Sequence, residues 1–497
     1  MIEIAVKYLE NVTGAKPWTG NADRVCRGCV IDSRQVETDS IFVAFPGERV
    51  DGNDYASQAI EAGAACVVLT REPSRELIRQ ADDHECAIFT ADDATEFLLR
   101  LAQGYRARMR CTVVGITGSI GKTTTKDVLC ALLATRYRVH ATRGNYNSLI
   151  GMPLTILAAP RNTQIMVLEM GMDSLGQIER LSRCAQPTYS IITKIGTSHI
   201  GLLGSRENIA RAKAEIVCGM APSSVNFEGH HSKLILNGED EFTPFITATF
   251  AKPAGVDVVL CGTSADDDVS ATNIELDQNG SPVFDLMFAN GAQFKTKLGI
   301  TGKQAVPNAL YAAAVASELG IPQFTIDEVF REAQITGHRQ EVRLAANGAR
   351  VIDDSYNASP ESMAAGLDLL STLPCRGARV AILGEMGELG DEAPRLHQLV
   401  GAYAASKKPG LLICVGDENA RQMASAARLM GMDEDGIQVV RELKEQGCRA
   451  KFIMISQVVP DCDKLIARYS HVLAPTDLVL VKGSRFVGLD RFVEEVC

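Results

Sequence analysis

The chain has 497 residues, a length that suggests about three domains. Hydrophobic residues make up 46% and charged residues 22%, as in ordinary globular proteins. The formal charge of −11 argues against a nucleic-acid-binding protein, which would usually present a basic face. No apolar run reaches the roughly 18 residues that span a membrane, and we find no signal peptide at the N-terminus. We therefore expect a cytoplasmic protein without membrane insertion or a nucleic-acid partner.

Fourteen cysteines are scattered along the chain. Cys26 and Cys29 form a C-x-x-C pair, but no second pair and no nearby histidine accompanies it. Structural zinc normally needs four ligands, so we expect free thiols, as in a cytosolic protein.

Residues 1–106 predict a small α/β domain with a helix over 56–62 and a strand over 65–70. Polar turns follow its apolar strands at Asp32-Ser33-Arg34 and between Gly47 and Gly52. Binding loops tend to lie at such strand ends, although ordinary turns with a solvated arginine would give the same pattern.

The second predicted domain, residues 107–337, opens with V-V-G-I-T-G-S-I-G-K-T-T-T-K over 113–126. An apolar strand, a glycine loop and a helix start form the arrangement that holds a nucleotide phosphate, because loop amides and the helix N-terminus point at the anion. Lys122 would reach the outer phosphates, and the Thr123 hydroxyl would hold Mg²⁺. The spacing departs from the strict Walker pattern, since Gly115 is six residues before Gly121.

Further candidates stand at later strand ends of this domain. Glu169 ends a buried strand, where a carboxylate lies at the ligand crevice and suits Mg²⁺, although a capping or salt-bridged glutamate is the alternative. His199 follows the next strand and, taken alone, is more often structural. Asn145 and Asn147 lie in a Gly- and Pro-containing loop before a helix, where they contact substrate or close turns.

The remainder of the second domain has four predicted parts. A helix follows Gly204, with Ser205 as its N-cap and Ile209, Ala212 and Ile216 on its apolar side. Lys213 on this helix is, taken alone, a surface lysine. We expect an exposed loop over 221–233, mostly strands and turns over 241–300, and a long helix after Gly302.

Residues 338–497 predict a third domain. An apolar strand ends in Asp353-Asp354, Tyr356-Asn357 follows, and a helix starts at Pro360. Strands over 379–384, 410–415 and 477–482 alternate with helices, which predicts a parallel sheet covered on both faces.

The motif G-x-T-G-x-x-G-K-T-T resembles the ATP loop of the Mur ligase family, whose members join a carboxylate to an amine at the expense of ATP. In the first domain, the ordered set D-S-R, F-V-A-x-x-G and D-G-x-x-Y resembles the same family. N-x-N-x-x-I-G-x-P-L-T in the second domain and I-D-D-x-Y-N-A-x-P-x-S-M and L-G-E-M-G-E-L-G in the third are similar to its D-alanyl-D-alanine-adding branch, with Ser359 where that branch has asparagine.

The resemblance implies an α/β protein of three domains: a small UDP-binding domain, a central P-loop ATPase-like parallel-sheet domain and a Rossmann-like C-terminal domain. It implies that UDP-N-acetylmuramoyl-tripeptide and D-alanyl-D-alanine are joined through an acyl phosphate, by a protein that we expect to be a monomer. Two competing hypotheses remain. One is a family ligase with another acceptor, against which the blocks 353–363 and 384–390 argue. The other is a P-loop ATPase switch or transporter subunit, which leaves the D-S-R domain unexplained.

Site roles are also implied by the resemblance. The implied catalytic residues are Lys122, His199, Lys213 and Arg339, the last separated from Gly337 by an inserted His338. ATP is expected at Gly115, Thr117, Gly118, Ser119, Gly121, Lys122, Thr123, Thr124, Asn308, Arg339, Asp354, Tyr356 and Asn357. Two Mg²⁺ ions are expected at Thr123, Glu169, His199 and a Lys213 that has reacted with CO₂ to form a carbamate. Substrate contacts are expected at Ser33, Arg34, Gly47, Asp51, Asn145, Asn147, Lys482, Ser484 and Arg485.

Overall fold

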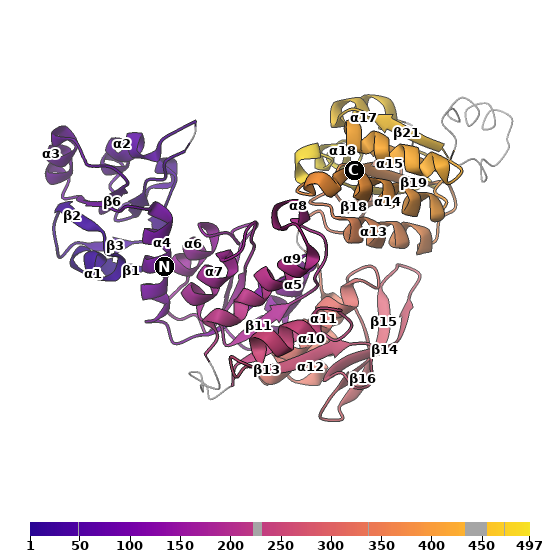
Figure 1. Ribbon diagram of the computed structural model, residues 1–497, viewed down its shortest axis with the longest axis horizontal. Helices are drawn as coiled ribbons and strands as arrows, with labels where there is room; N and C mark the ends of the chain where they lie inside the picture. Colours follow the sequence, from indigo (N-terminus) through magenta and orange to yellow (C-terminus); the bar gives the residue numbers. More distant parts are fainter. Residues whose placement is uncertain (48, 222–230, 336, 433–454, 472) are drawn as a thin grey trace.

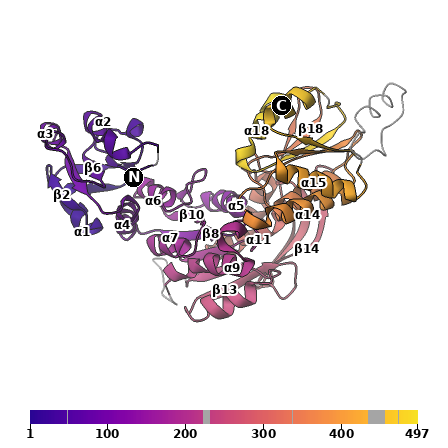
Figure 2. The ribbon, with the colours of Figure 1, turned by 45° about the horizontal axis from the view of Figure 1, so that its top comes forward.

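The chain folds into three lobes in sequence order, and the central lobe lies between the other two (Figures 1 and 2). The computed structural model describes residues 1–47, 49–221, 231–335, 337–432, 455–471 and 473–497. Each lobe contains its own sheet flanked by helices, which confirms the α/β class. Within the described ranges no helix is both long and apolar enough to cross a membrane. Most of the predicted loop over 221–233 lies outside the described residues.

The N-terminal lobe is built on a five-stranded sheet in the order β2-β7-β6-β5-β4, parallel except for β2. Its strands are β1 (Glu3–Ala5), β2 (Lys16–Thr19), β3 (Val25–Arg27), β4 (Cys29–Val30), β5 (Ile41–Val43), β6 (Cys66–Leu69) and β7 (Ala87–Thr90). Its helices are η1 (Val6–Tyr8), α1 (Leu9–Thr13), η2 (Ser33–Gln35), η3 (Gly52–Tyr55), α2 (Ala56–Glu61), α3 (Arg75–Asp83) and α4 (Ala94–Arg106).

The central lobe is built on a nine-stranded sheet in the order β16-β15-β14-β13-β12-β11-β8-β10-β9. Its strands are β8 (Thr112–Thr117), β9 (Val139–Ala141), β10 (Ile165–Glu169), β11 (Tyr189–Ile192), β12 (Lys233–Asn237), β13 (Asp257–Gly262), β14 (Val269–Leu276), β15 (Pro282–Phe288) and β16 (Gln293–Lys297). Its helices are α5 (Lys122–Ala134), α6 (Gly151–Ala158), α7 (Gln177–Ala185), α8 (Ile200–Leu203), α9 (Arg206–Ala214), η4 (Glu215–Gly219), α10 (Thr243–Ile246), η5 (Thr247–Ala251), α11 (Ala305–Glu318) and α12 (Gln323–Glu332). From β9 to β14 all pairings are parallel, so the carboxyl ends of β8, β10 and β11 share one edge.

The N-cap predicted at Ser205 is present in this lobe, whereas the strands predicted over 241–300 begin later than expected. Ser205 caps α9 as predicted, because its hydroxyl accepts a hydrogen bond from the amide of Asn208. The prediction of strands over 241–300 is wrong at its start, where residues 243–251 are helical. Phe242, Ile246 and Phe250 recur every four residues and pack into the core, which is the spacing of a helix face.

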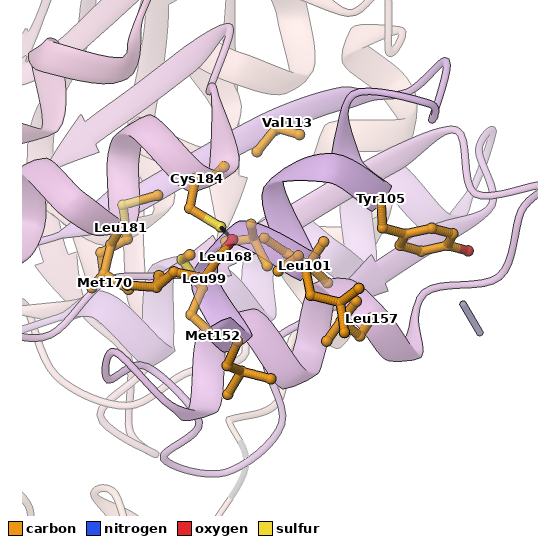
Figure 3. Packing of buried hydrophobic residues seen from close by; sticks show 14 of the residues in the cluster. Leu99, Leu101, Tyr105, Val113, Met152, Leu157, Leu168, Met170, Leu181 and Cys184 are labelled. Carbon is orange, nitrogen blue, oxygen red and sulfur yellow. Dashed lines mark hydrogen bonds between the residues drawn. The ribbon is translucent and has the colours of Figure 1, made fainter. Parts of the chain in front are cut away.

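The N-terminal and central lobes share one hydrophobic core. Helix α4 packs against α6 and α7 of the central lobe, with Leu99 and Leu101 beside Leu157 and Leu181 (Figure 3). The Tyr105 hydroxyl donates a hydrogen bond to a central-lobe carbonyl at 2.8 Å. A shared apolar core resists relative movement of two domains, so these lobes form one body.

The C-terminal lobe is built on a six-stranded sheet in the order β17-β18-β22-β19-β20-β21, parallel except for β17. Its strands are β17 (Glu341–Leu344), β18 (Arg350–Asp354), β19 (Arg379–Gly384), β20 (Leu411–Val415), β21 (Ile455–Val459) and β22 (Leu478–Lys482). Its helices are α13 (Pro360–Thr372), η6 (Gly390–Glu392), α14 (Ala393–Ser406), α15 (Glu418–Leu429), α17 (Cys462–Tyr469), η7 (Arg485–Val487) and α18 (Asp490–Val496). Two separate apolar clusters involve this sheet, as predicted for a sheet covered on both faces.

The C-terminal lobe meets the central lobe through a close backbone contact. Helix α8 lies against η6, and the amide of Gly201 donates to the carbonyl of Glu388 at 3.1 Å. A Cβ atom at Gly201 would lie 2.3 Å from the amide nitrogen of Gly390, so this approach requires glycine. Ile200 adds an apolar contact to the C-terminal core.

Candidate active site

A cavity of about 790 Å³ is lined by residues of both the central and the C-terminal lobes. The central lobe contributes the loop between β8 and α5 and the residues that follow β10 and β11. The C-terminal lobe contributes the loops that follow β18, β19 and β22. The carboxyl ends of β8, β10, β11, β18, β19 and β22 therefore all lie at this cavity. Ligands bind at such strand ends in open α/β sheets.

The loop between β8 and α5 lines the cavity with Ser119, Ile120 and Gly121. Gly118 and Gly121 have φ of 143° and 92°, a backbone region that disfavours other residues. A Cβ atom at Gly118 would lie 1.9 Å from Thr193 Oγ1, so the loop also needs glycine for space. Helix α5 begins without a side-chain cap, which leaves its first amides available to an anion. Lys122 Nζ donates to the Gly118 carbonyl at 2.8 Å.

Thr123 and Glu169 place hard oxygen atoms beside this loop. Thr123 Oγ1 donates to Glu169 Oε2 at 3.2 Å, and Glu169 is 1% exposed. Its other oxygen, Oε1, has no hydrogen-bond partner among the described residues, and Lys126 Nζ lies 3.6 Å from it. A buried carboxylate with an unsatisfied oxygen is costly, and a divalent cation would satisfy it. The pair therefore fits Mg²⁺, which binds through a few protein oxygens and phosphates.

His199 lines the cavity in a left-handed backbone conformation, with φ of 67°. Its Nδ1 lies 2.6 Å from Oε2 of Glu388 in the C-terminal lobe. The contact joins the strand end of β11 to the loop that follows β19. The sequence did not single out Glu388, because nothing local to either segment shows that they meet.

Lys213 is 2% exposed, so the interpretation as a surface lysine is wrong. Helix α9 packs against α7, α8 and α10, and burial therefore extends beyond its expected apolar side. Burial, and next the charge of Lys122, lowers the pKa of Lys213 well below its ordinary value. No hydrogen bond or ion pair joins Lys213 Nζ to another described residue, and Lys213 does not line the cavity.

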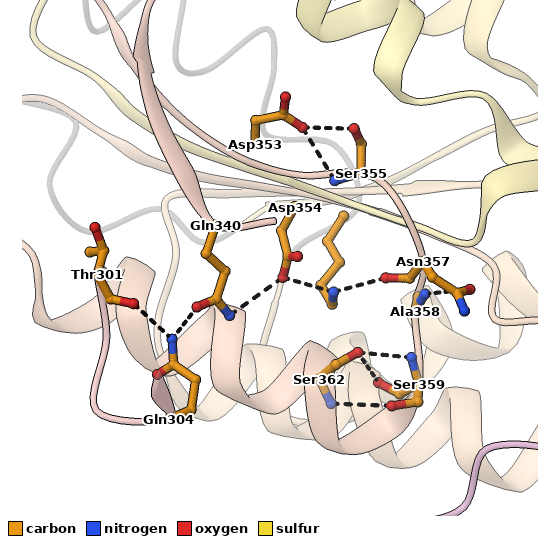
Figure 4. A network of polar contacts seen from close by, with 11 residues as sticks. Thr301, Gln304, Gln340, Asp353, Asp354, Ser355, Asn357, Ala358, Ser359 and Ser362 are labelled. Carbon is orange, nitrogen blue, oxygen red and sulfur yellow. Dashed lines mark hydrogen bonds and ion pairs between the residues drawn. The ribbon is translucent and has the colours of Figure 1, made fainter. Parts of the chain in front are cut away.

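A polar network connects the central and C-terminal lobes (Figure 4). Gln304 donates to Gln340, and Gln340 Nε2 lies 3.4 Å from Asp354 Oδ2. Lys482 Nζ lies 2.7 Å from the same oxygen and donates to the Asn357 carbonyl at 2.9 Å. Burial raises the pKa of Asp354, and the neighbouring Lys482 opposes that shift. Lys482 thus already uses two of its donors inside the lobe.

Arg339 of the C-terminal lobe and Asn308 of the central lobe both line the cavity. The Arg339 guanidinium lies 4.3 Å from the centre of the Tyr356 ring, a cation–π distance. Asn308 Oδ1 accepts from Thr125 Oγ1 at 3.3 Å, and a Cβ atom at Gly121 would lie 2.2 Å from Asn308 Oδ1. The glycine loop is therefore in contact with helix α11.

Most of the predicted site residues are brought together here. Those that line the cavity are Ser119, Gly121, Lys122, Thr123, Thr124, Asn145, Asn147, Glu169, His199, Asn308, Arg339, Asp354, Tyr356, Asn357, Lys482, Ser484 and Arg485. Gly115, Thr117 and Gly118 do not line it. A Cβ atom at Gly115 would meet Met170 and Ile216 side chains at 3.2 Å, and Thr117 Oγ1 donates to the Met170 carbonyl at 2.8 Å. Gly115 and Thr117 therefore make contacts between β8 and its neighbours inside the lobe and do not face the cavity.

The four predicted residues of the N-terminal lobe lie outside this cavity. Ser33 Oγ donates to Gln58, and Arg34 pairs with Asp32 at 2.7 Å. A Cβ atom at Gly47 would lie 2.6 Å from the Val50 carbonyl oxygen. Local turn chemistry thus accounts for much of the D-S-R pattern.

Asp51 caps η3 by accepting from the Asn53 amide at 2.9 Å. Asn53 and Arg71 line a separate cavity of about 300 Å³ at the end of β6, and Arg71 Nη1 lies 3.3 Å from Asp51 Oδ2. The sequence interpretation missed Arg71, although a polar run directly after a predicted strand is a signal for a binding loop.

The parallel sheet, the glycine loop and the uncapped helix start define a P-loop protein. More narrowly, the chain belongs to the Mur ligase family, which confirms the resemblance. Residues 26–105 match the Mur ligase family catalytic domain, residues 116–316 the Mur ligase middle domain, and residues 338–485 the Mur ligase glutamate ligase domain.

Three relatives match the chain over nearly its whole length. The UDP-N-acetylmuramoyl-tripeptide–D-alanyl-D-alanine ligase of Bacillus subtilis is 33% identical over 497 residues, 100% of this chain and 99% of the relative. A crystal structure of MurF from Acinetobacter baumannii has a TM-score of 0.83 at 27% identity, covering 100% of this chain and 99% of that one. MurF ligase from Thermotoga maritima, solved with ADP, has a TM-score of 0.76 at 25% identity, covering 94% and 96%. The similarity therefore includes all three lobes and not the P-loop alone.

Proposed function

We propose that this protein is an ATP-dependent ligase that joins D-alanyl-D-alanine to UDP-N-acetylmuramoyl-tripeptide during peptidoglycan precursor synthesis. The observation that carries the proposal is the cavity in which the glycine loop, Lys122 and Glu169 face the strand ends of the C-terminal lobe. Relatives that share the whole chain length at 33% identity carry this activity in their names. A simple ATPase would not need a second α/β lobe across the phosphate site.

The reaction has two steps. The terminal carboxylate of the tripeptide attacks the γ-phosphorus of ATP, the bond to ADP breaks, and an acyl phosphate forms. The amine of the dipeptide then attacks the acyl carbon, phosphate leaves, and a proton is released. A carboxylate and a phosphate repel each other, so the first step depends on positioning and on neutralised charge.

The phosphate site contains groups suited to this task. Amides of the glycine loop and the start of α5 would hold the phosphates, with Lys122 and Arg339 as the cations. We assign two Mg²⁺ ions to this site, with Thr123, Glu169, His199 and a carbamylated Lys213 as their protein ligands. Mg²⁺ held there would neutralise charge on the transferred phosphoryl group. Asn308, Tyr356, Asp354 and Asn357 would contact the nucleotide.

Lys213 fits carbamylation because of its burial. The unprotonated amine is the form that attacks CO₂, forming an N–C bond and releasing a proton, and burial favours that form. The resulting carbamate supplies the oxygen ligands that a lysine amine lacks. A carbamate would also give a function to a buried amine that has no bonding partner among the described residues.

Substrate roles divide among the lobes. We assign the uridine diphosphate to the N-terminal lobe, with Ser33, Arg34, Gly47 and Asp51 nearby, in a domain over residues 1–106. Asn145 and Asn147 would meet the peptide in the central domain, residues 107–337. Lys482, Ser484 and Arg485 would meet the dipeptide carboxylate in the third domain, residues 338–497, because cations in a cavity favour a carboxylate.

The test is phosphate release from ATP and Mg²⁺ with each substrate alone and with both. Release that requires both, with a pentapeptide product by mass spectrometry, is the expected result. Release with neither substrate would support the ATPase hypothesis, and activity with another amine would reassign the acceptor. We further propose a cytoplasmic monomer, consistent with thirteen free cysteines in the described chain; light scattering at the mass of two chains would contradict the monomer.

A further inference from the structure

The C-terminal lobe lines the cavity with three carboxylates, and two of them are committed to internal contacts. Asp354 is buried and paired with Lys482 at 2.7 Å. Both oxygens of Glu361 accept from Thr197, Oε1 from the amide at 2.8 Å and Oε2 from the hydroxyl at 3.1 Å. The third is Glu388, whose side chain is 56% exposed. Within the described chain it has one side-chain partner, His199, through Oε2.

The loop of Glu388 is joined to the loop of Arg485. β19 and β22 are adjacent parallel strands, and the two loops follow their carboxyl ends. Ser484 Oγ accepts from the Gly387 amide at 2.9 Å, and the Ser484 amide donates to the Glu385 carbonyl at 3.1 Å. An anion and a cation therefore stand on two cross-linked loops of one cavity wall.

Each of these two loops also contributes an apolar residue to the cavity lining. The side chain of Phe486 is 68% exposed and lines the cavity, and a Cβ atom at Gly387 would lie 3.2 Å from its ring. Leu389 also lines the cavity. A wall with a carboxylate, an apolar surface and a guanidinium is complementary to a small zwitterionic dipeptide with methyl side chains.

We propose that Glu388 binds the ammonium group of the incoming dipeptide and holds it beside the phosphate site. This inference rests on the proposed function and assigns one end of its amine substrate. Charges of both signs line the rest of the cavity. The cations are Lys122, Lys194, Arg339, Lys482 and Arg485, and the other carboxylates are Glu169, Asp173, Glu239, Asp354 and Glu361. Lys122 and Arg339 at the phosphate site would repel an ammonium group that had no carboxylate beside it.

The contact with His199 shows that Glu388 reaches the phosphate side. His199 follows β11 in the central lobe, and its Nδ1 lies 2.6 Å from the Glu388 carboxylate. An ammonium group held at this carboxylate stands at the boundary of the two lobes, where the acyl phosphate would form. Positioning of this kind accelerates reaction between two bound groups.

The experiment compares Glu388→Gln with wild type in the full-length protein. Steady-state kinetics give KM for each of the three substrates. Acyl-phosphate formation is measured separately by trapping with hydroxylamine in the absence of dipeptide. We expect KM for D-alanyl-D-alanine to rise by at least about tenfold, as for loss of a charge-assisted hydrogen bond. KM for ATP and for the tripeptide nucleotide, and the trapping rate, should stay within about twofold, because uncharged glutamine keeps the shape of the loop.

A second readout separates the ammonium group from the rest of the dipeptide. N-Acetyl-D-alanyl-D-alanine has no ammonium group, so its inhibition constant should be the same in wild type and in Glu388→Gln. The matched control is Glu392→Gln, because Glu392 lies on η6, pairs with exposed Arg395 and does not line the cavity. Glu392→Gln should leave all kinetic constants unchanged.

Unchanged KM for the dipeptide in a folded Glu388→Gln protein would overturn the inference. It would also be overturned if Glu388→Gln lost hydroxamate trapping, or changed its Mg²⁺ requirement, without any effect on the dipeptide. Either of those results would place Glu388 on the phosphate side. If Glu388→Gln unfolds, Glu388→Asp keeps the charge and should raise KM for the dipeptide without affecting trapping. Wild type that forms no hydroxamate and no pentapeptide would instead contradict the proposed function.

Discussion

The ammonium group of Lys482 lies 2.7 Å from Oδ2 of Asp354, and the Lys482 side chain is 2% exposed. Asp354 ends β18 and Lys482 ends β22, the neighbouring parallel strand in the sheet. The pair therefore connects two strand ends at the wall of the cavity, away from bulk water. Because both groups are buried, each charge is stabilised mainly by its partner and not by water.

Removing one partner of this pair should destabilise the C-terminal lobe strongly. We expect Lys482→Met to lower the free energy of unfolding by about 3–5 kcal/mol, because Asp354 is left buried without its cation. Urea denaturation followed by circular dichroism measures the effect. The control is Lys407→Met, since Lys407 pairs with the half-exposed Asp368 and should contribute less than about 1 kcal/mol. A Lys482→Met protein as stable as Lys407→Met would show that Asp354 loses nothing when its partner is removed.

Lys122 should be needed for ligation and not for folding. Its Nζ contacts one loop carbonyl at 2.8 Å, and burial lowers its pKa, so little stability depends on its charge. We expect Lys122→Ala to reduce the rate of phosphate release by at least about 10²–10³-fold, the loss typical of a removed transition-state contact. Melting temperature should change little. Ligation near the wild-type rate would contradict the assignment of the loop to phosphate.

Lys213 should respond to CO₂ if it forms a carbamate. We expect lower activity in buffer depleted of CO₂ and recovery on addition of bicarbonate. Lys213→Ala should be inactive and regain part of its activity with a short carboxylic acid that fills the space left by the side chain. Activity is measured by phosphate release with both substrates. An active Lys213→Ala protein, without added acid, would remove Lys213 from the metal site.

His397 should make stability depend on pH. Its Nε2 accepts from the Met386 amide at 2.9 Å, so the neutral ring holds the loop that carries Glu388. Burial lowers the pKa of His397 below its ordinary 6.5. The unfolded chain therefore takes up a proton near pH 6.5 while the folded protein does not, and stability falls as the pH drops below 6.5.

The matching variant is His397→Gln, whose amide oxygen accepts the same hydrogen bond without titrating. Between pH 6.5 and the lowered folded pKa, wild type should lose up to about 1.4 kcal/mol per pH unit more than His397→Gln. Chemical denaturation across this pH range measures both slopes. Equal slopes would mean that the imidazole takes up its proton in the folded protein as well.

Much of the fold and of the phosphate site follows from local sequence signals. Strand β8, the glycine turn and the start of α5 at Lys122 are contiguous, so spacing and residue type predict them. Glu169 at a strand end and Ser205 as an N-cap were predicted for the same reason. Alternation with helices also predicted that the strands over 379–384, 410–415 and 477–482 form a parallel sheet, and β19, β20 and β22 do so.

The tertiary structure decided what depends on distant segments. Lys213 is buried only because α9 is packed by helices on several sides, and Gly115 packs against Met170 and Ile216 instead of lining the cavity. Glu388 meets His199 because two lobes dock at Gly201 and Gly390. Local periodicity predicts which residues share a face of a helix or strand. Which segment packs against that face depends on contacts between parts of the chain that are far apart in sequence. Such contacts have no signature in either segment alone, so burial and interlobe contacts are known only once the chain is folded.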